Sequence, residues 1–459
     1  MSDIAAEAGR GAFVRHELAA ASSPPVLHRG IAGWARESLF SGWFNITLTV
    51  LSIALIALVV PPLARFLFID AVWNGETRDA CVGASGACWP FIKAKIGQFI
   101  YGFYPIAERW RPNIVFALAV ALLTPLLILS APFKRLNAIL FFGIFPFVAF
   151  VLLTGGNLEM QRFVIGRLIS LGSVFELISF GLRLSFWVDY LLSAALLIAL
   201  AMGVTRLLGG YARATAKAAT MTFLLLALVL IVFDFDFGLV PVESQSWGGL
   251  LVTLVVAVTG IVVSLPLGVL LALGRRSELP AVKAFSVIFI EFWRGVPLIT
   301  VLFFASYMLP LFLPGGFTVD SLLRVLIGVT LFAAAYMAEV VRGGLQAIPK
   351  GQYEGAAALG LGYWQTMSLV ILPQALTLVI PGIVNTFIGL FKDTTLVLIV
   401  AIFDLLGQLR AAFSDPNWST PTTLYTGFAF GAAVYFTFCF GMSRYSMFVE
   451  RRLSAGKRH

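Results

Sequence analysis

The sequence predicts an all-α integral membrane protein with about ten transmembrane helices of roughly 20 apolar residues each. Of the 459 residues, 59% are hydrophobic and 12% are charged, and the mean hydropathy is +0.94. Soluble domains carry about 25% charged residues, so most of this chain is expected to lie in lipid. Apolar runs of span length occur at 44–68, 113–130, 137–154, 186–206, 218–237, 247–273, 285–313, 321–341, 375–404 and 423–444.

One further apolar region, 160–186, is not predicted to span the membrane. Its interruptions are the charged residues Arg162, Arg167, Glu176 and Arg183. A span with this many charges is unfavourable in hydrocarbon. We therefore expect a helix that lies at the membrane interface.

The positions of lysine and arginine predict the orientation. With ten spans and the N-terminal arm 1–43 inside, 19 of the 32 basic residues fall in inner loops, nine in outer loops and four within spans. Those within spans are Arg65, Arg294, Arg324 and Lys392. Because basic residues are retained on the cytoplasmic side, both termini are predicted to be cytoplasmic, including the basic tail 447–459.

Several function classes are excluded by what the sequence lacks. The three histidines, at 16, 28 and 459, lie in the tails, and the three cysteines have no zinc-site spacing. No GxxxxGK[ST] motif is present, so the chain is expected to bind no ATP through a P-loop of its own. HExxH and GxSxG are absent as well, which argues against a membrane enzyme. We therefore expect no metal and no cofactor on this chain. We also expect no nucleic-acid partner, because the basic residues are scattered rather than gathered on one face.

The segment 349–373, PKGQYEGAAALGLGYWQTMSLVILP, differs from the spans around it. Pro349 suits the first turn of a short helix, and Gly360 suits a left-handed C-terminal cap. The small residues at 355–358 allow another surface to approach that helix closely. A second short helix is expected from Tyr363 to Leu372, ended by Pro373. On pattern alone, a hairpin at the membrane interface explains the segment equally well.

The same segment resembles the EAA loop of permease subunits of binding-protein-dependent ABC importers. That pattern is Glu-Ala-Ala, three residues, Gly, nine residues, Ile, one residue and Leu-Pro. The matching residues here are Glu354, Gly355, Ala356, Gly360, Val370, Leu372 and Pro373. Gly355 replaces an alanine, which costs a helix about 0.5–1 kcal/mol, and Val370 replaces isoleucine.

Flanking motifs narrow the resemblance to the polar amino-acid branch of these permeases. They are EFWRGVPL at 291–298, AYMAEVVRGGLQ at 335–346, KGQYEGAAALGLGYWQTMSLVILPQA at 350–375 and NTFIGLFKDTTL at 385–396. The resemblance implies a type I ABC importer permease core of five helices over 238–446, with the EAA loop at 342–374. The preceding part, 44–237 with an outer loop at 69–112, resembles the M-type permease of general L-amino-acid (Aap/Bzt-type) transporters.

This resemblance implies a location and several partners. The location is the bacterial inner membrane. The partners are an ABC ATPase dimer that carries ATP and Mg, a second related permease and a periplasmic amino-acid-binding protein. The residues implied to couple to the ATPase are Glu354, Gly355, Ala356, Leu359 and Gly360. Alternatively, Glu354 only stabilises the N-terminus of its own helix, where the dipole favours an anion. A secondary transporter, or a structural membrane subunit without ATPase coupling, is the alternative function.

Residues 375–404 are the predicted substrate path. A helix of this length measures about 45 Å, against about 30 Å for the hydrocarbon core. We therefore expect a tilt, or a break at 391–395, where charged and β-branched residues collect. A break exposes N–H groups at Thr394 and Thr395 that favour a carboxylate. The predicted substrate-binding residues are Asn385, Lys392, Asp393, Thr394, Thr395 and Glu339. Alternatively, Lys392 and Asp393 pair with each other or with Glu339, or they lie at a membrane interface as anchors.

Cys81 and Cys88 lie in the outer loop, separated by VGASGA. In an oxidising compartment they form either a disulfide that tightens the loop or two free thiols. The sequence does not choose between these states, because a disulfide requires a short Cα–Cα distance.

Overall fold

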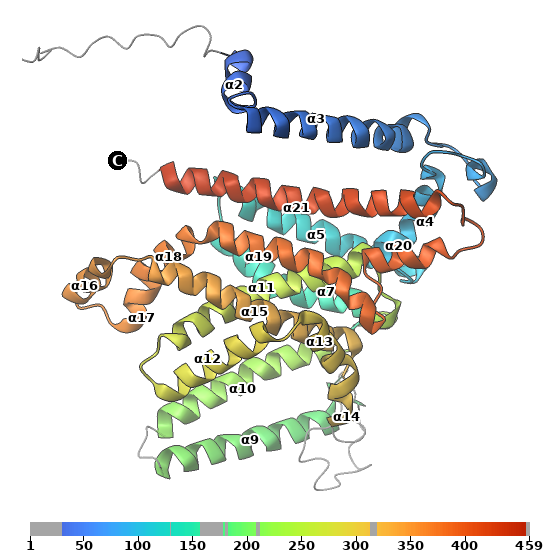
Figure 1. Cartoon of the computed structure of the whole chain (residues 1–459). Helices are drawn as coiled ribbons and strands as arrows, with labels where there is room; N and C mark the ends of the chain where they lie inside the picture. The colour runs from blue at the N-terminus through green and yellow to red at the C-terminus, as the bar shows by residue number, and fades with distance from the viewer. Residues whose placement is uncertain are drawn as a thin grey trace, which may run out of the picture. The chain divides into compact units, whose positions relative to one another are not determined.

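The computed structural model describes residues 30–128, 130–156, 178–179, 182–207, 212–312 and 319–455, and their regular structure is almost entirely helical (Figure 1). The strands in these residues are β1 (Ile178–Ser179) and β2 (Leu182–Arg183), which pair antiparallel. Most of the predicted interface helix at 160–186 lies outside the described residues. The described end of that region is this hairpin, followed by a helix that begins at Leu184.

Contacts divide the chain into two compact units. The first runs to Val72 and includes Gly83–Ala87, and the second comprises Trp73–Val82 and the chain from Cys88 onward. This division does not follow the domain boundaries predicted from hydropathy and resemblance, which stay predictions. The described helices of the first unit are α2 (Gly30–Ser38) and α3 (Trp43–Ala64), with a π-helical end at Arg65–Ile69. α3 is an apolar helix of 22 residues, and none of them is buried within its own unit.

The second unit holds the remaining described α-helices. They are α4 (Trp89–Tyr101), α5 (Trp110–Leu127), α6 (Lys134–Ile139), α7 (Phe145–Thr154), α9 (Leu184–Leu207), α10 (Ala212–Asp234), α11 (Gly249–Arg275), α12 (Pro280–Gly295), α13 (Leu298–Phe303), α14 (Leu309–Phe312), α15 (Ser321–Gln346), α16 (Lys350–Ala358), α17 (Tyr363–Gln365), α18 (Leu372–Leu378), α19 (Ile380–Asp393), α20 (Leu405–Phe413) and α21 (Thr423–Ala455).

Among the described residues, eight helices are long and apolar enough to cross a membrane, or nine if one bent pair counts as a span. The sequence predicted about ten, and the described residues account for eight or nine of them. The apolar part of α10, Ala216–Ile231, is shorter than a span. The predicted span at 285–313 is bent by 102° between Pro280–Gly295 and Leu298–Phe312. The cause is local, because Pro297 disfavours the α conformation at Val296, whose ψ is 132°.

The core of the second unit forms where α11 packs against α15. Gly268 permits this approach, because a Cβ atom there would lie 2.7 Å from the Met337 Cβ. Two buried clusters follow from this packing. One includes Leu251, Val256, Leu302, Val325, Val329, Leu390 and Val397. The other includes Met337, Val341, Leu345, Ile371, Ala375 and Ile383, with Tyr353 packed against it.

The predicted outer loop at 69–112 contains the helix α4, which is part of this core. Phe91 and Phe99 on α4 are fully buried and contact aromatic rings of the chain beyond α19. Gln98 donates a hydrogen bond to Gln408 on α20 over 3.0 Å. Hydropathy carries no span-length signal for α4, because this helix has only 13 residues.

Candidate functional site

The helix α16 ends in the cap that its sequence predicts. Gly360 has a φ of +72°. Its N–H bonds the Ala357 carbonyl at 2.9 Å, and the Leu361 N–H bonds the Ala356 carbonyl at 3.2 Å. These two bonds form a Schellman motif, which requires a left-handed residue and therefore favours glycine. Pro349 occupies the position just before the first turn of α16. Proline lacks an N–H group, but at this position the helix needs none for its hydrogen bonds.

One side of α16 is exposed and the other is anchored. Glu354 and Gly355 are exposed, as is Leu359 with 79% of its surface accessible, whereas Ala356 is 3% exposed. In the described part of the chain, the Glu354 carboxylate has neither a hydrogen bond nor an ion pair. Glu354 lies in the second turn of α16. Because the dipole effect falls off after the first turn, this position argues against a role in stabilising its own helix N-terminus.

The second predicted helix of this segment continues beyond Pro373, contrary to the expectation that it ends there. α17 leads into a π-helical turn at Thr366–Ile371 and then into α18. A proline inside an α-helix removes a hydrogen bond and crowds the preceding turn. We attribute the wider π turn just before Pro373 to this crowding. α18 is tied to α16 by a hydrogen bond of 2.9 Å from Gln374 to Gln352.

Glu339 belongs to a group of charged side chains on α11, α12 and α15. We call this group the Glu339 cluster; its members are Arg275, Glu291, Arg294, Glu339 and Arg342. The Arg275 Nη1 atom donates to Glu339 Oε1 at 2.8 Å and to Glu291 Oε1 at 2.9 Å. The Arg342 Nε and Nη2 atoms donate to Glu339 Oε2 at 2.9 and 2.7 Å. The Arg294 Nη1 atom lies 3.8 Å from the same oxygen.

Arg276, the residue next to Arg275, contacts α16 directly. Its Nη1 atom donates to the Tyr353 hydroxyl at 2.9 Å and to the Leu345 carbonyl at 3.3 Å. The Arg276 guanidinium also lies over the Tyr353 ring, 5.5 Å from its centroid, in a cation–π arrangement. The end of α11 therefore contacts both α16 and the Glu339 cluster.

Thr394 and Thr395 do not open a helix N-terminus, contrary to the predicted break. The α-helix tightens into a 3-10 helix at Thr394–Val400 without interruption. The Thr394 N–H bonds the Lys392 carbonyl, and the Thr394 side chain is buried with its hydroxyl on the Phe391 carbonyl at 2.8 Å. The Thr395 hydroxyl bonds the Lys392 carbonyl at 2.9 Å. An anion therefore finds no free N–H group at Thr394.

Lys392 and Asn385 are exposed on one face of α19. They are seven residues apart, which places them on the same side with a separation of about 10 Å along the axis. In the described residues, neither Asp393 nor Glu339 lies within ion-pair distance of Lys392. The alternative pairing of Lys392 with these two residues is thus not observed. The printed contacts of the Glu339 carboxylate are with Arg275, Arg294 and Arg342 rather than with the other predicted substrate residues.

A buried carboxylate, Asp404, was not predicted from the sequence. It is 0% exposed, accepts the Gly407 N–H at 2.9 Å as the N-cap of α20, and accepts the Tyr435 hydroxyl at 2.8 Å. Burial raises the pKa of the Asp404 carboxyl, although these hydrogen bonds oppose the shift. An Asp just before an apolar helical run is the signal that was available.

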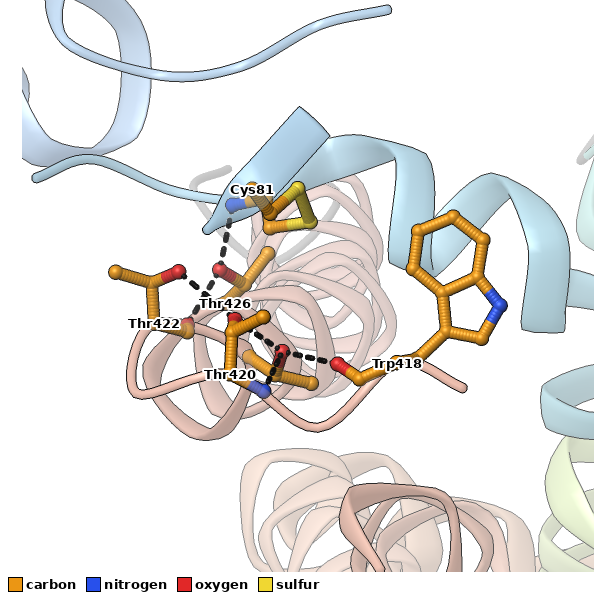
Figure 2. The surroundings of a disulfide bond; sticks show 7 residues. Cys81, Trp418, Thr420, Thr422 and Thr426 are labelled. Atoms are coloured by element: carbon orange, nitrogen blue, oxygen red, sulfur yellow. Dashed lines mark hydrogen bonds between the residues drawn. A yellow bond between two sulfur atoms is a disulfide. The ribbon is translucent and has the colours of Figure 1, made fainter. Parts of the chain in front are cut away.

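Cys81 and Cys88 are joined by a disulfide with a Cα–Cα distance of 5.7 Å. The Cys88 N–H donates to the Thr426 hydroxyl at 2.9 Å. Figure 2 shows the disulfide at Cys81 beside the start of α21, together with Trp418, Thr420, Thr422 and Thr426. The disulfide therefore closes the loop before α4, and the hydrogen bond from Cys88 fastens that loop to the first turn of α21.

Arg275, Arg276 and Tyr353 were not predicted as site residues. Charged residues within apolar spans, such as Glu291 and Arg294, were the signal for the Glu339 cluster. Nothing in the sequence pattern indicated that Arg276 and Tyr353 are neighbours, since they are 77 positions apart.

Comparison with known proteins gives consistent results. The model of the family "Binding-protein-dependent transport system inner membrane component" matches residues 264–455. The inner membrane amino-acid ABC transporter permease YhdY of Escherichia coli K12 is 42% identical over 92% of this chain and 93% of its own length. The glutamate/glutamine/aspartate/asparagine transport system permease BztC of Rhodobacter capsulatus is 43% identical over 97% of this chain and 99% of its own length.

Shorter proteins match part of the chain. The glutamate/aspartate import permease GltK of Escherichia coli O157:H7 is 31% identical over 47% of this chain and 96% of its own length. A crystal structure of an amino acid ABC transporter with histidines is 28% identical, with a TM-score of 0.40, over 44% of this chain and 92% of that chain.

Proposed function

Because this chain belongs to the family of binding-protein-dependent transport system inner membrane components, we propose that it carries polar L-amino acids across the bacterial inner membrane. The chain is a membrane-spanning permease subunit of an ABC importer. In this proposal a partner ATPase dimer supplies the energy by hydrolysing ATP with Mg, and a periplasmic binding protein delivers the amino acid. A second, related permease completes the membrane part.

The observation that carries the proposal is the form of α16. It is a short helix with a fixed cap at Gly360, a buried Ala356 and an exposed face that presents Glu354 and Leu359. A rigid helix with small exposed residues is suited to enter a groove on another protein. The ATPase is the partner that a permease of this family requires. We assign Glu354 to a basic group on that ATPase.

The charge distribution supports a cytoplasmic position for α16. Arg275, Arg276 and Arg342 lie at or near the ends of the helices α11 and α15, and Lys350 is the first residue of α16 itself. Basic residues are retained on the cytoplasmic side of bacterial inner membranes. In this orientation both termini are cytoplasmic, and the disulfide at Cys81 lies on the oxidising side.

The substrate path in this proposal runs along the face of α19 that carries Asn385 and Lys392. Both side chains are exposed, and the Lys392 ammonium is suited to the α-carboxylate of an amino acid. Asp393 is then the group for the α-ammonium, and Thr394 supports the helix from its buried position. The carboxylate is bound by a side-chain charge rather than by N–H groups of a broken helix.

The test is reconstitution of the complete importer in proteoliposomes with Glu354→Ala and Glu354→Gln. We expect both variants to insert normally, to co-purify with less ATPase, and to lose hydrolysis stimulated by the binding protein. Glu278→Gln is the matched control. Glu278 is also an exposed carboxylate, and it lies three residues beyond the end of α11 that contacts α16. Uptake that proceeds without any ATPase subunit would establish a secondary transporter instead.

A further inference from the structure

We propose that the contact between Arg276 and Tyr353 transmits the movement of α16 to the membrane helices, through Arg275 and the Glu339 cluster. This inference rests on the proposed function, in which the ATPase moves α16. It assigns positioning roles to residues outside the surface that meets the ATPase.

The first step is the attachment of α16 to α11. Tyr353 packs against the buried cluster that contains Leu345 and Met367. On its outer edge Tyr353 holds Arg276 by a hydrogen bond of 2.9 Å and by the stacking of the guanidinium on its ring. A displacement of α16 therefore acts on the end of α11 through a side-chain contact as well as through the connecting backbone.

The second step is the connection from Arg276 to Arg275. Arg275 is the last residue of α11, and Arg276 forms its C-cap, with its N–H bonded to the Leu273 carbonyl at 3.0 Å. The two residues share a rigid helix end, so neither backbone moves without the other. Their side chains diverge, since Arg276 binds α16 and Arg275 binds Glu291 on α12 and Glu339 on α15.

The third step is the ability of the Glu339 cluster to rearrange. Three arginines face two glutamates, and the Glu339 carboxylate contacts all three guanidinium groups. Removing the partner of a partly buried charge is costly, but here one arginine can leave while others still neutralise Glu339. Arg294, at 3.8 Å, is the loosest of the three. The helices α12 and α15 can therefore shift past each other without an unpaired carboxylate.

The last step places a hinge beside the cluster. Glu291 and Arg294 lie in the final turns of α12, directly before the 102° bend at 296–297. Hinges are a few element-terminal residues that absorb backbone changes. A shift of α12 at Glu291 is thus delivered to the bend, and beyond it to α13, which packs in the core through Leu302.

The experiment compares Arg276→Ala, Tyr353→Leu and their double variant in the complete importer. The readout is the amount of amino acid imported per ATP hydrolysed. We expect each single variant to lower this ratio at least about fivefold, the lower end of typical coupling between sites. ATPase co-purification and basal hydrolysis should stay unchanged. The maximal uptake rate should fall, while the substrate concentration for half-maximal uptake should not.

The double variant tests whether both residues act through one contact. We expect its loss to be no larger than that of either single variant. Tyr353→Phe keeps the ring but loses the hydroxyl, so its import per ATP hydrolysed should lie between the values of the wild type and Tyr353→Leu. This variant also keeps the test decisive if Tyr353→Leu misfolds. Glu278→Gln should behave as the wild type.

Three results would overturn the inference: normal coupling in both single variants, losses that add in the double variant, or loss of ATPase binding by Tyr353→Phe. The last result would place Tyr353 in the docking surface. Failure of the proposed function is distinguishable, because the wild-type chain would then not bind the ATPase at all.

Discussion

Replacing Gly360 by alanine should weaken the cap of α16 without disturbing its surroundings. A Cβ atom at this position would meet no heavy atom within 4 Å, so a steric clash with neighbouring residues is absent. The φ of +72° remains as the cause of strain. A left-handed conformation costs a residue with a side chain roughly 1–2 kcal/mol. At about 1.4 kcal/mol per factor of ten, the capped form becomes roughly 5- to 30-fold less favoured relative to uncapped forms.

Two other variants make this prediction specific. Gly355→Ala also adds a methyl group in open space, but within the helix. It should stabilise α16 by about 0.5–1 kcal/mol. Gly360→Asn should cost less than Gly360→Ala, because asparagine visits the left-handed region more readily. The order of coupling efficiency should therefore be Gly355→Ala at or above the wild type, then Gly360→Asn, then Gly360→Ala.

The assay is uptake per ATP hydrolysed by the reconstituted importer, with membrane insertion checked separately. The reasoning is refuted if Gly360→Ala couples as well as the wild type while Gly355→Ala is impaired. That result would mean that the exposed glycine surface, rather than the cap, is what the ATPase requires.

Three further predictions concern other parts of the chain. Cys81 and Cys88 should resist thiol labelling until a reductant is added, and full labelling of both without reductant would contradict the disulfide. A hydrogen bond from Lys95 holds the pKa of Asp415 in the folded protein below its ordinary value. The pair therefore stabilises the fold fully above the unfolded-state pKa of about 3.9. This stabilisation is lost as the pH falls through the lower pKa of the folded state. Lys95→Met should therefore lower the melting temperature at neutral pH, and its difference from wild type should shrink in acid; a constant difference would argue against the pair. Lys392→Ala should raise the substrate concentration for half-maximal uptake and leave basal ATP hydrolysis intact, and equal loss of both activities would assign it to structure.

Local features were predicted well from the sequence. The cap at Gly360 is determined by the residues within two turns of it, and its positive φ needs no distant partner. The bend at Val296 could also have been predicted, because Pro297 follows it directly. Treating 285–313 as one hydrophobic run concealed that bend.

Features that depend on distant residues were not predicted. The helix α4 is too short for a span signal, and its burial depends on aromatic partners beyond α19. The predicted substrate group included Glu339 because the side chain lies in an apolar span. Its partner Arg275 is 64 positions away, and hydropathy does not report which helices become neighbours.

The sequence by itself determined that this chain lies in a membrane and that the short helix before Gly360 ends in a glycine cap. Composition decides the first, and the glycine at a left-handed position decides the second. Only the tertiary structure decided that Tyr353 meets Arg276 and that Arg275 joins α12 to α15. The physical reason is that a hydrogen bond needs an approach of about 3 Å, and the packing of α11 against α15 sets which distant side chains come that close.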